Sequence, residues 1–395
     1  MPNDHLPAGL AAAGLPDTPA HDHTHAPHRG SPVEEYGPLL AAAGTLGVFF
    51  VAHDAVEHAG VVGASVALVV LFCVILWGAV GVMHHAERVA HVLGEPVGTL
   101  VLTLSAISVE LALIVSVMLT GEQNPTLARD TMFAVLMIIM NGLVGLALLL
   151  GGLRHRQQSY NLEGARSFLV VLIPLAVCAL VLPNFTRSTD SPTLTFEQGL
   201  FFGALTLALY GVFLALQTSR HRAFFAEVEG VEETQERRGL TPDQWRLVIR
   251  HGALLLLTLI PVAVLAHDMA GVLTVVATEF RMPPELAGVI IAALILAPEG
   301  LAALRAAWAN RLQRSVNILL GSSLSTIGMT VPTALLVGYL IGHEIILGLE
   351  YSYVTLLAVT LLVSTLTFGS HKTDMLKGAV HLVLFGIYLM LVFMP

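Results

Sequence analysis

The chain has 395 residues, of which 55% are hydrophobic and only 12% charged, with a mean hydropathy of +0.78 and a formal net charge of −9. Soluble globular proteins contain about 25% charged residues, so this composition excludes an ordinary soluble protein and indicates an integral membrane protein embedded in a lipid bilayer. The negative net charge gives no indication of a basic surface that could bind nucleic acid. Cys73 and Cys178 lie inside apolar runs and match no metal-ligand spacing, so we interpret them as small hydrophobic residues.

The first 36 residues are polar and rich in proline and histidine, and they lack the apolar run of a secretory signal peptide. Four histidines lie in the segment HDHTHAPH at residues 21–28. We interpret residues 1–36 as a disordered accessory tail, because this composition cannot bury enough apolar surface to fold. Weak metal capture by the histidines is the alternative interpretation.

Apolar runs then predict eleven membrane-spanning helices, most of them near the ~20 residues that a bilayer requires. The expected fold class is therefore an all-α membrane protein. The predicted spans cover residues 37–52, 61–83, 97–119, 131–152, 166–183, 196–217, 247–266, 286–308, 316–340, 351–369 and 376–394. The chain divides into the tail, a first helix with its loop (37–60), a five-helix unit (61–217), an acidic linker (218–246) and a second five-helix unit (247–395).

The distribution of basic residues supports this number of spans. All but three of the 19 Lys and Arg residues fall on one side of the membrane, the exceptions being Arg129, Arg187 and Arg281. Because Lys and Arg gather in cytoplasmic loops, we expect the N-terminus and the linker in the cytoplasm and the C-terminus outside. The linker is either a cation sensor or a solvated connector. Its candidate cation-sensing residues are Glu229, Glu232, Glu233 and Glu236.

The two five-helix units share a pattern. In each unit a glutamate occupies the fourteenth position of the second span, Glu110 in the first and Glu299 in the second. The following span carries a polar residue twelve positions after an arginine in both units, Asn141 in one and Thr326 in the other. An odd number of spans inverts the second copy, and inverted repeats with a site at the membrane midplane are typical of secondary transporters.

Glu110 and Glu299 are the candidate functional residues, because a charge near the bilayer centre costs about 2.5–3.5 kcal/mol even on a lenient scale. Desolvation disfavours the charged carboxylate, so each acid should hold either a proton or a cation. Binding of a hard cation to the deprotonated acids expels protons, which is the physical basis of exchange. The alternative is a structural acid paired with an arginine such as Arg305. Pro298 and Gly300 predict a break or kink in the helix at Glu299.

Hydroxyl and amide side chains accompany the two acids. Asn141 is a candidate site residue, because an unpaired amide deep in an apolar span is unfavourable. The hydroxyl groups either line the ion pathway or mediate close helix packing. They belong to Ser105, Ser108, Ser322, Ser325 and Thr326.

Three further polar clusters lie near the ends of predicted spans. We interpret them as solvated helix ends, with metal binding or proton delivery as the alternatives. They are His53, Asp54, Glu57 and His58; His84, His85, Glu87, Arg88 and His91; and His267 with Asp268.

Four stretches resemble a known family, the ChaA-type bacterial antiporters of the calcium/proton exchanger branch of the calcium/cation antiporter superfamily. They are GEPVGTLVLTL, SVELALIVSVML, TLARDTMFAVLMIIMNGLVGLALLLGGLRHR and LILAPEGLAALRAAWANRLQRSVNILLGSSLSTIGMTVP. The resemblance runs from residue 37 to the end of the chain. It implies eleven helices arranged as one plus two inverted repeats of five, in a bacterial inner membrane, with Glu110 and Glu299 as the essential acids.

The sequence therefore predicts a cation/proton antiporter that works by alternating access, and not an enzyme. Ca²⁺/H⁺ exchange is the first expectation and Na⁺/H⁺ or K⁺/H⁺ exchange at the same site the alternative. The acids lie in Ile-Ser-Val-Glu and Ala-Pro-Glu-Gly contexts, whereas many exchangers of this branch use glycine-asparagine-x-x-glutamate. A cation channel is less consistent with a chain that has no visible filter, and a hydrolase would need a motif such as H-E-x-x-H. We expect no cofactor besides the transported cation and H⁺, and the oligomeric state stays open.

Overall fold

The computed structural model describes residues 31–58, 60–94, 97–120, 125–218, 222–225 and 240–394. The histidine-rich segment at residues 21–28 and the four linker glutamates lie outside these ranges. The predicted tail boundary at residue 36 is wrong, because helix α1 (Pro32–His58) already begins at Pro32. Ser31 and Glu34 cap this helix reciprocally, with a backbone-to-side-chain hydrogen bond of 3.0 Å in one direction and 3.3 Å in the other.

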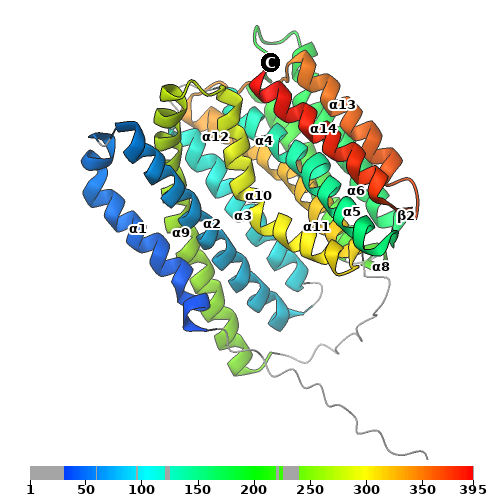
Figure 1. Ribbon diagram of the computed structural model, residues 1–395, viewed down its shortest axis with the longest axis horizontal. Helices are drawn as coiled ribbons and strands as arrows, with labels where there is room; N and C mark the ends of the chain where they lie inside the picture. The colour runs from blue at the N-terminus through cyan, green and yellow to red at the C-terminus, as the bar shows by residue number, and fades with distance from the viewer. Residues whose placement is uncertain are drawn as a thin grey trace, which may run out of the picture.

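The described chain is almost entirely helical (Figure 1). Eight of its helical stretches are long and apolar enough to cross a membrane, and two shorter apolar helices, Leu100–Ser116 and Tyr351–Thr367, accompany them. The elements after α1 are α2 (Gly60–Leu93), α3 (Val97–Thr120), α4 (Leu127–Met137), η1 (Ile138–Leu143), α5 (Val144–His155), β1 (Gln158–Ser159), α6 (Leu162–Leu180), η2 (Leu182–Phe185), α7 (Phe196–Thr218), α8 (Arg222–Phe225), α9 (Pro242–Glu279), α10 (Pro284–Trp308), α11 (Leu312–Ser325), η3 (Thr326–Thr330), α12 (Val331–Ile341), α13 (Tyr351–Thr367), β2 (Lys372–Thr373) and α14 (Met375–Phe393).

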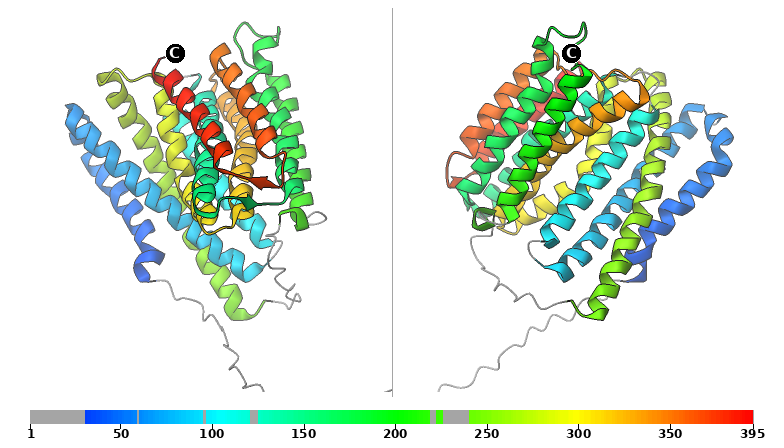
Figure 2. Two further views of the ribbon diagram at one scale, coloured as in Figure 1. Left: turned by 45° about the vertical axis from the view of Figure 1, so that its right-hand side comes forward. Right: turned by 180° about the vertical axis from the view of Figure 1, so that it is seen from behind.

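Helices α1, α2 and α9 pack on one another and form one side of the molecule, on the left in Figure 1. Helices α5, α6, α13 and α14 lie on the opposite side, and the views in Figure 2 agree on this arrangement. Helix α3 packs against α2 and α9, while α10 packs against α4 and α11. The two helices that carry the predicted acids therefore lie in the middle of the bundle.

Two membrane-spanning stretches change their helical winding near their centres. Segments η1 (Ile138–Leu143) and η3 (Thr326–Thr330) are π-helical, and each lies between two α-helices of the same stretch. The sequence predicted a break or a kink at Glu299, and the break is wrong, because α10 runs without interruption from Pro284 through Pro298 to Trp308. Proline removes one backbone hydrogen bond, and the helix accommodates this loss without ending. Departures from α-helical winding are often found at functional sites.

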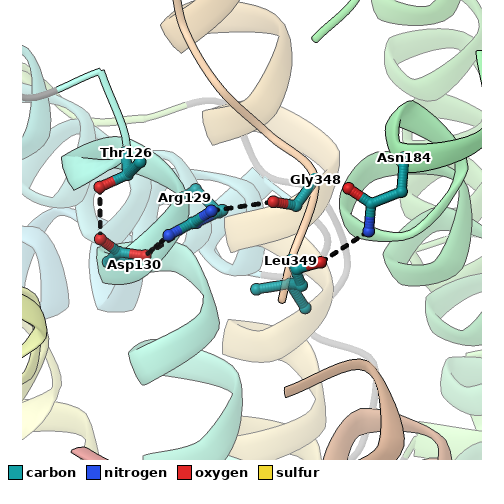
Figure 3. Close-up of polar contacts among 6 residues, drawn as sticks. All are labelled: Thr126, Arg129, Asp130, Asn184, Gly348 and Leu349. Atoms are coloured by element: carbon teal, nitrogen blue, oxygen red, sulfur yellow. Dashed lines mark hydrogen bonds and ion pairs between the residues drawn. The ribbon is translucent and has the colours of Figure 1, made fainter. Parts of the chain in front are cut away.

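A buried ion pair fastens the start of α4 to the segment between α12 and α13 (Figure 3). Arg129 Nη2 lies 2.8 Å from Asp130 Oδ1, and Arg129 Nη1 donates to the Gly348 carbonyl at 2.9 Å. Thr126 donates to the other carboxylate oxygen of Asp130 at 2.8 Å. Asn184 holds the neighbouring carbonyl of Leu349 at 2.6 Å. Each of these contacts joins residues that hydropathy assigns to loops or span ends.

A short antiparallel ribbon joins the α5–α6 turn to the α13–α14 turn. Its two strands pair Gln158 with Thr373 and Ser159 with Lys372. Asn161 caps α6 and Asp374 caps α14, each accepting backbone N–H bonds. The ribbon was not predicted from the sequence, because two-residue strands carry no periodic signal.

Candidate functional site

The two predicted acids line one small cavity in the middle of the bundle. Glu110 comes from α3 and Glu299 from α10, and their carboxylates interact electrostatically. The cavity measures about 10 Å³, which is roughly the room that one water molecule needs. The other lining residues come from α2, α3, α10 and α11, and are Ala79, Met83, Ala106, Val109, Ile295, Pro298 and Ser322.

Glu110 is buried and bonds to the π-helical segment η3. Thr330 Oγ1 donates to Glu110 Oε1 at 3.1 Å, and the Thr326 hydroxyl also hydrogen-bonds this carboxylate. Thr326 lies 2.9 Å from the Ser322 carbonyl as well, and one hydroxyl proton can serve only one acceptor at a time. The structure therefore brings the predicted Thr326 to Glu110, and adds Thr330, a hydroxyl of the same segment that was not among the candidate site residues.

Glu299 is half-buried, and only part of its carboxylate is hydrogen-bonded. Its carboxylate hydrogen-bonds the Ser322 side chain, whereas Glu299 Oε2 is buried without a hydrogen-bond partner among the described residues. No ion pair within the described part of the chain links it to Arg305, which is exposed. The structural alternative, an acid neutralised by that arginine, therefore has no support in the contacts of the structure. A buried oxygen without a partner is costly, and a proton or a cation would satisfy it.

Tyr210 is a further residue beside the acids. It is buried in α7, where both Glu110 and Glu299 act on it electrostatically. Gly328 of η3 lies against its ring, so that an added Cβ there would come 3.3 Å from the Tyr210 side chain. Sequence reasoning missed Tyr210, because a single tyrosine in an apolar span carries no pattern.

Three predicted hydroxyls bond within their own helices. Ser105 donates to Val101 and Ser108 to Leu104, both at 2.7 Å. Ser325 donates to the Ser322 carbonyl at 3.0 Å. Among the described residues, these three hydroxyls bond backbone carbonyls of their own helices and form no hydrogen bond with either acid.

Asn141 faces a second, separate polar cluster. Its Nδ2 donates to Thr360 Oγ1 at 2.8 Å, and its Oδ1 lies 3.2 Å from His381 Nδ1. His381 Nε2 in turn lies 3.0 Å from Thr367 Oγ1. All four residues are buried, so this cluster fastens η1 to α13 and α14. His381 and Thr360 were not predicted, since the pairing of these spans cannot be read from hydropathy.

Close packing fixes the acid-bearing α10 against its neighbours. A Cβ added at Gly288 would lie 3.0 Å from the backbone of Asp130 and Thr131 in α4. A Cβ added at Gly300, next to Glu299, would lie 3.0 Å from Leu143 of η1. Glycine permits these approaches because it has no side chain to displace.

A larger cavity of about 350 Å³ lies between α7 and α12, away from the acids. Its walls are mostly apolar, and Phe196 and Tyr339 stack at its rim with ring centroids 4.0 Å apart. None of the predicted site residues lines it. Its composition suits lipid contact rather than ion binding.

The chemistry of the small cavity is that of oxygen ligands. Two carboxylates and the Ser322 hydroxyl line it, and Thr330 bonds Glu110 from beside it; none of the cavity-lining side chains is basic, and the thioether of Met83 is the single sulfur among them. Such ligands suit protons and hard cations rather than soft metals. The described residues contain no group of three or more His, Cys, Asp or Glu side chains placed to hold a resident metal ion.

Comparison with known proteins identifies the family of the chain. The family model for the sodium/calcium exchanger protein matches residues 63–219 and 251–394. The chain belongs to this family. Its members are membrane transporters, so the exchanger is not an enzyme.

Relatives of the exchanger cover most of its length. A putative ionic transporter, y4hA of Sinorhizobium fredii, is 40% identical over 333 residues, which is 84% of this chain and 90% of that protein. The sodium-potassium/proton antiporter ChaA of Escherichia coli is 37% identical over 320 residues, 81% of this chain and 86% of its own. The crystal structure of the H⁺/Ca²⁺ exchanger CAX shares the fold with a TM-score of 0.67 at 16% identity, covering 90% of this chain and 88% of that one.

Proposed function

We propose that the exchanger is a cation/proton antiporter in which Glu110 and Glu299 bind either protons or the transported cation. The observation that carries this proposal is Glu299 Oε2, a buried carboxylate oxygen without a hydrogen-bond partner in the described structure, in a cavity shared with Glu110. A fixed cationic side chain would neutralise such a pair permanently. Its absence from the cavity lining leaves the pair able to exchange one positively charged species for another.

The hydroxyl groups influence whether the two acids hold protons or the cation. Thr330 donates to Glu110, the Thr326 hydroxyl is shared between Glu110 and the Ser322 carbonyl, and Ser322 bonds to Glu299. These contacts favour the charged carboxylates, whereas burial disfavours them. Protons entering from one side neutralise the acids and release the cation. Loss of those protons on the other side restores the oxygen ligands, so transport in one direction is coupled to transport in the other.

The membrane arrangement belongs to the same proposal. Eleven spans, grouped as one helix and two inverted repeats of five, place Glu110 and Glu299 in equivalent helices of opposite orientation. The family model matches two segments of the chain, residues 63–219 and 251–394, which correspond closely to the two proposed repeats. The inner membrane of a bacterium, with the N-terminus in the cytoplasm, is the location that the basic residues and the relatives favour.

Ca²⁺ is our first choice of cation, because two carboxylates balance its charge and hydroxyls and water can complete its oxygen shell. One relative with the same fold is an H⁺/Ca²⁺ exchanger. Na⁺ or K⁺ is the second candidate, because the relative that is 37% identical is a sodium-potassium/proton antiporter. The two possibilities differ in whether both acids or one acid must lose a proton for each cation.

Everted membrane vesicles test the proposal. A proton gradient is established, and Ca²⁺, Na⁺ or K⁺ is added in turn while an acid-sensitive dye reports dissipation of the gradient. We expect at least one cation to dissipate it, and Glu299→Gln and Glu110→Gln each to reduce the rate by more than about tenfold, since removal of one charged ligand costs more than ~1.4 kcal/mol.

Glu197→Gln is the matched control, because this exposed glutamate lies in the first turn of α7 and is not among the cavity-lining residues. It should retain the wild-type rate. If no cation dissipates the gradient, the proposed exchange is wrong. If both acid variants transport at the wild-type rate, the site is wrong although the family assignment stands.

A further inference from the structure

A pair of histidines joins α2 to α9 outside the acid cavity. His85 Nδ1 and His251 Nδ1 lie 3.0 Å apart, and the two ring centroids are 5.2 Å apart. Both side chains are buried, with 1% and 7% of their surface exposed. The contact joins the C-terminal part of α2 to the N-terminal part of α9, which is the cytoplasmic end of both helices in the proposed orientation.

Charged groups of three helices surround the histidine pair. From α1, the Glu35 carboxylate lies 4.0 Å from His251 Nε2 and 2.7 Å from Arg250 Nη2. Tyr36, also on α1, accepts a hydrogen bond from Arg250 at 2.5 Å. The remaining titratable or charged neighbours are His84 and Arg88 of α2.

The distance between the two Nδ1 atoms limits how many protons the pair can hold. At 3.0 Å one nitrogen must donate a hydrogen and the other must accept it. An imidazolium carries hydrogens on both nitrogens, so the contact survives with one charged ring but not with two. Glu35 can balance the first positive charge, whereas a second would face Arg250 and Arg88 as well.

One of the two helices that the pair joins, α2, also lines the acid cavity. Ala79 and Met83 of α2 line the acid cavity, and His85 follows on the same helix. Helices α2 and α9 approach so closely that a Cβ added at Gly78 would collide with the side chain of Val262. A change in the contact at one end of this helix pair therefore acts on a wall of the cavity.

We propose that His85 and His251 are positioning residues for exchange, which hold α2 against α9 while the pair carries at most one proton charge and release this contact when both rings are protonated. The inference rests on the proposed function in one respect: it assigns to the pair a proton-dependent control of the site formed by Glu110 and Glu299. Acidification on the cytoplasmic side then loosens the wall of the cavity and slows exchange.

Hydrogen-deuterium exchange of the full-length protein in detergent tests the contact itself. Exchange rates, corrected for the intrinsic effect of pH, are followed for peptides from the end of α2 and the start of α9. Burial, together with the neighbouring His251, lowers the pKa of His85 to about 4. We therefore expect protection in wild type to fall by about threefold or more between about pH 7 and about pH 4, since one coupled proton changes an equilibrium by at most about tenfold per pH unit. His251→Gln, which can still form the hydrogen bond but cannot be charged, should keep its protection at the lower pH.

Transport in everted vesicles supplies the second measurement, because their outer medium represents the cytoplasm. The decline of the rate at acid outer pH should be weaker by about threefold in His85→Gln and His251→Gln than in wild type. His91→Gln, an exposed histidine near the end of the same helix, is the matched control and should follow wild type.

The proposal is overturned if both Gln variants reproduce the wild-type pH dependence of protection, or if His91→Gln alters it equally. It is also overturned if protection responds to the histidines but the pH profile of transport does not. Absence of transport in wild type would instead contradict the proposed function. The hydrogen-deuterium exchange measurement would still decide whether the contact between His85 and His251 depends on protonation.

Discussion

Thr330, in the π-helical segment that follows α11, donates a hydrogen bond of 3.1 Å to the carboxylate of Glu110 on α3. The two residues belong to different five-helix units of the proposed repeat. This contact therefore ties the first acid to the unit that carries the second, and the hydroxyl favours the charged form of the acid.

Replacing Thr330 with valine tests this contact. Hydrogen bonds to charged groups contribute about 1.5–3 kcal/mol, so we expect the cation concentration for half-maximal exchange to rise by roughly tenfold or more as protons compete better for Glu110. Thr333→Val is the control, because the Thr333 hydroxyl donates to Met329 of its own chain segment at 2.8 Å. Equal cation dependence in the two variants would contradict the assigned role of Thr330.

The pH dependence of cation binding follows from competition at the same carboxylates. When one proton leaves for each cation bound, the apparent dissociation constant rises about tenfold for each pH unit of acidification, and when two leave it rises about a hundredfold. The sign is fixed because the cation requires the deprotonated acids. Isothermal titration of the purified protein across several pH values gives the slope, and a slope of zero would show that protons and cation do not share the site.

Gly328 should be sensitive to the smallest added side chain. An added Cβ would approach Tyr210 to 3.3 Å, which is tight enough to displace η3 and the threonines that bond Glu110. Gly328→Ala is expected to lower the exchange rate severalfold, consistent with about 1–3 kcal/mol for overpacking. Gly321→Ala is matched to it, since its Cβ would meet Phe168 at an ordinary 3.7 Å, and it should exchange at nearly the wild-type rate.

Asn141 should affect stability more than ion affinity. Asn141→Leu removes the hydrogen-bond partner of the Thr360 hydroxyl and of His381 Nδ1, which is expected to cost about 1–3 kcal/mol of folding free energy and to lower the melting temperature in detergent. Adding Thr360→Val to Asn141→Leu should lower the stability little further, because Asn141 and Thr360 act together through one hydrogen bond. An unchanged melting temperature together with weaker cation binding would instead place Asn141 in the ion site.

The buried pair of Arg129 and Asp130 should be essential to folding. Arg129→Met leaves a buried carboxylate without its charge partner, with an expected loss of about 3–5 kcal/mol. Arg166→Met removes a partner from an exposed ion pair with Glu163 and should cost less than about 1 kcal/mol. The two variants are compared by their yield of monodisperse protein and by their thermal unfolding. Similar values for both would argue against an anchoring role of the pair of Arg129 and Asp130.

The sequence alone identified residues whose burial in a membrane is energetically unfavourable. Glu110 and Glu299 were predictable because acids in long apolar runs are rare, and the apolar runs themselves located most of the helices. The contacts of Asn141 could not be predicted, because the twelve-residue spacing assumes uniform α-helical winding at about 100° per residue. A π-helical segment inserts extra residues into a turn and redirects every side chain beyond it.

The roles of Thr330 and Tyr210 depend on which helices lie side by side, and hydropathy does not contain that information. The predicted break at Glu299 failed for a simpler reason. Proline removes one backbone donor, and a helix packed on all sides by other helices tolerates this loss. A residue whose burial is energetically unfavourable can thus be located from the sequence, whereas its contact partners can be identified only once the packing of the helices is known.

The hydroxyls that bond the two acids all come from one stretch of chain, Leu312–Ile341. The corresponding stretch of the other unit, Leu127–His155, sends its amide to α13 and α14 instead. In the proposed repeat, one half therefore supplies the hydroxyls that bond the acids, and the other uses its amide to hold neighbouring helices together. A chain built from two copies of the first half would carry a glutamate in each copy but would lack the hydroxyls that hydrogen-bond the acids.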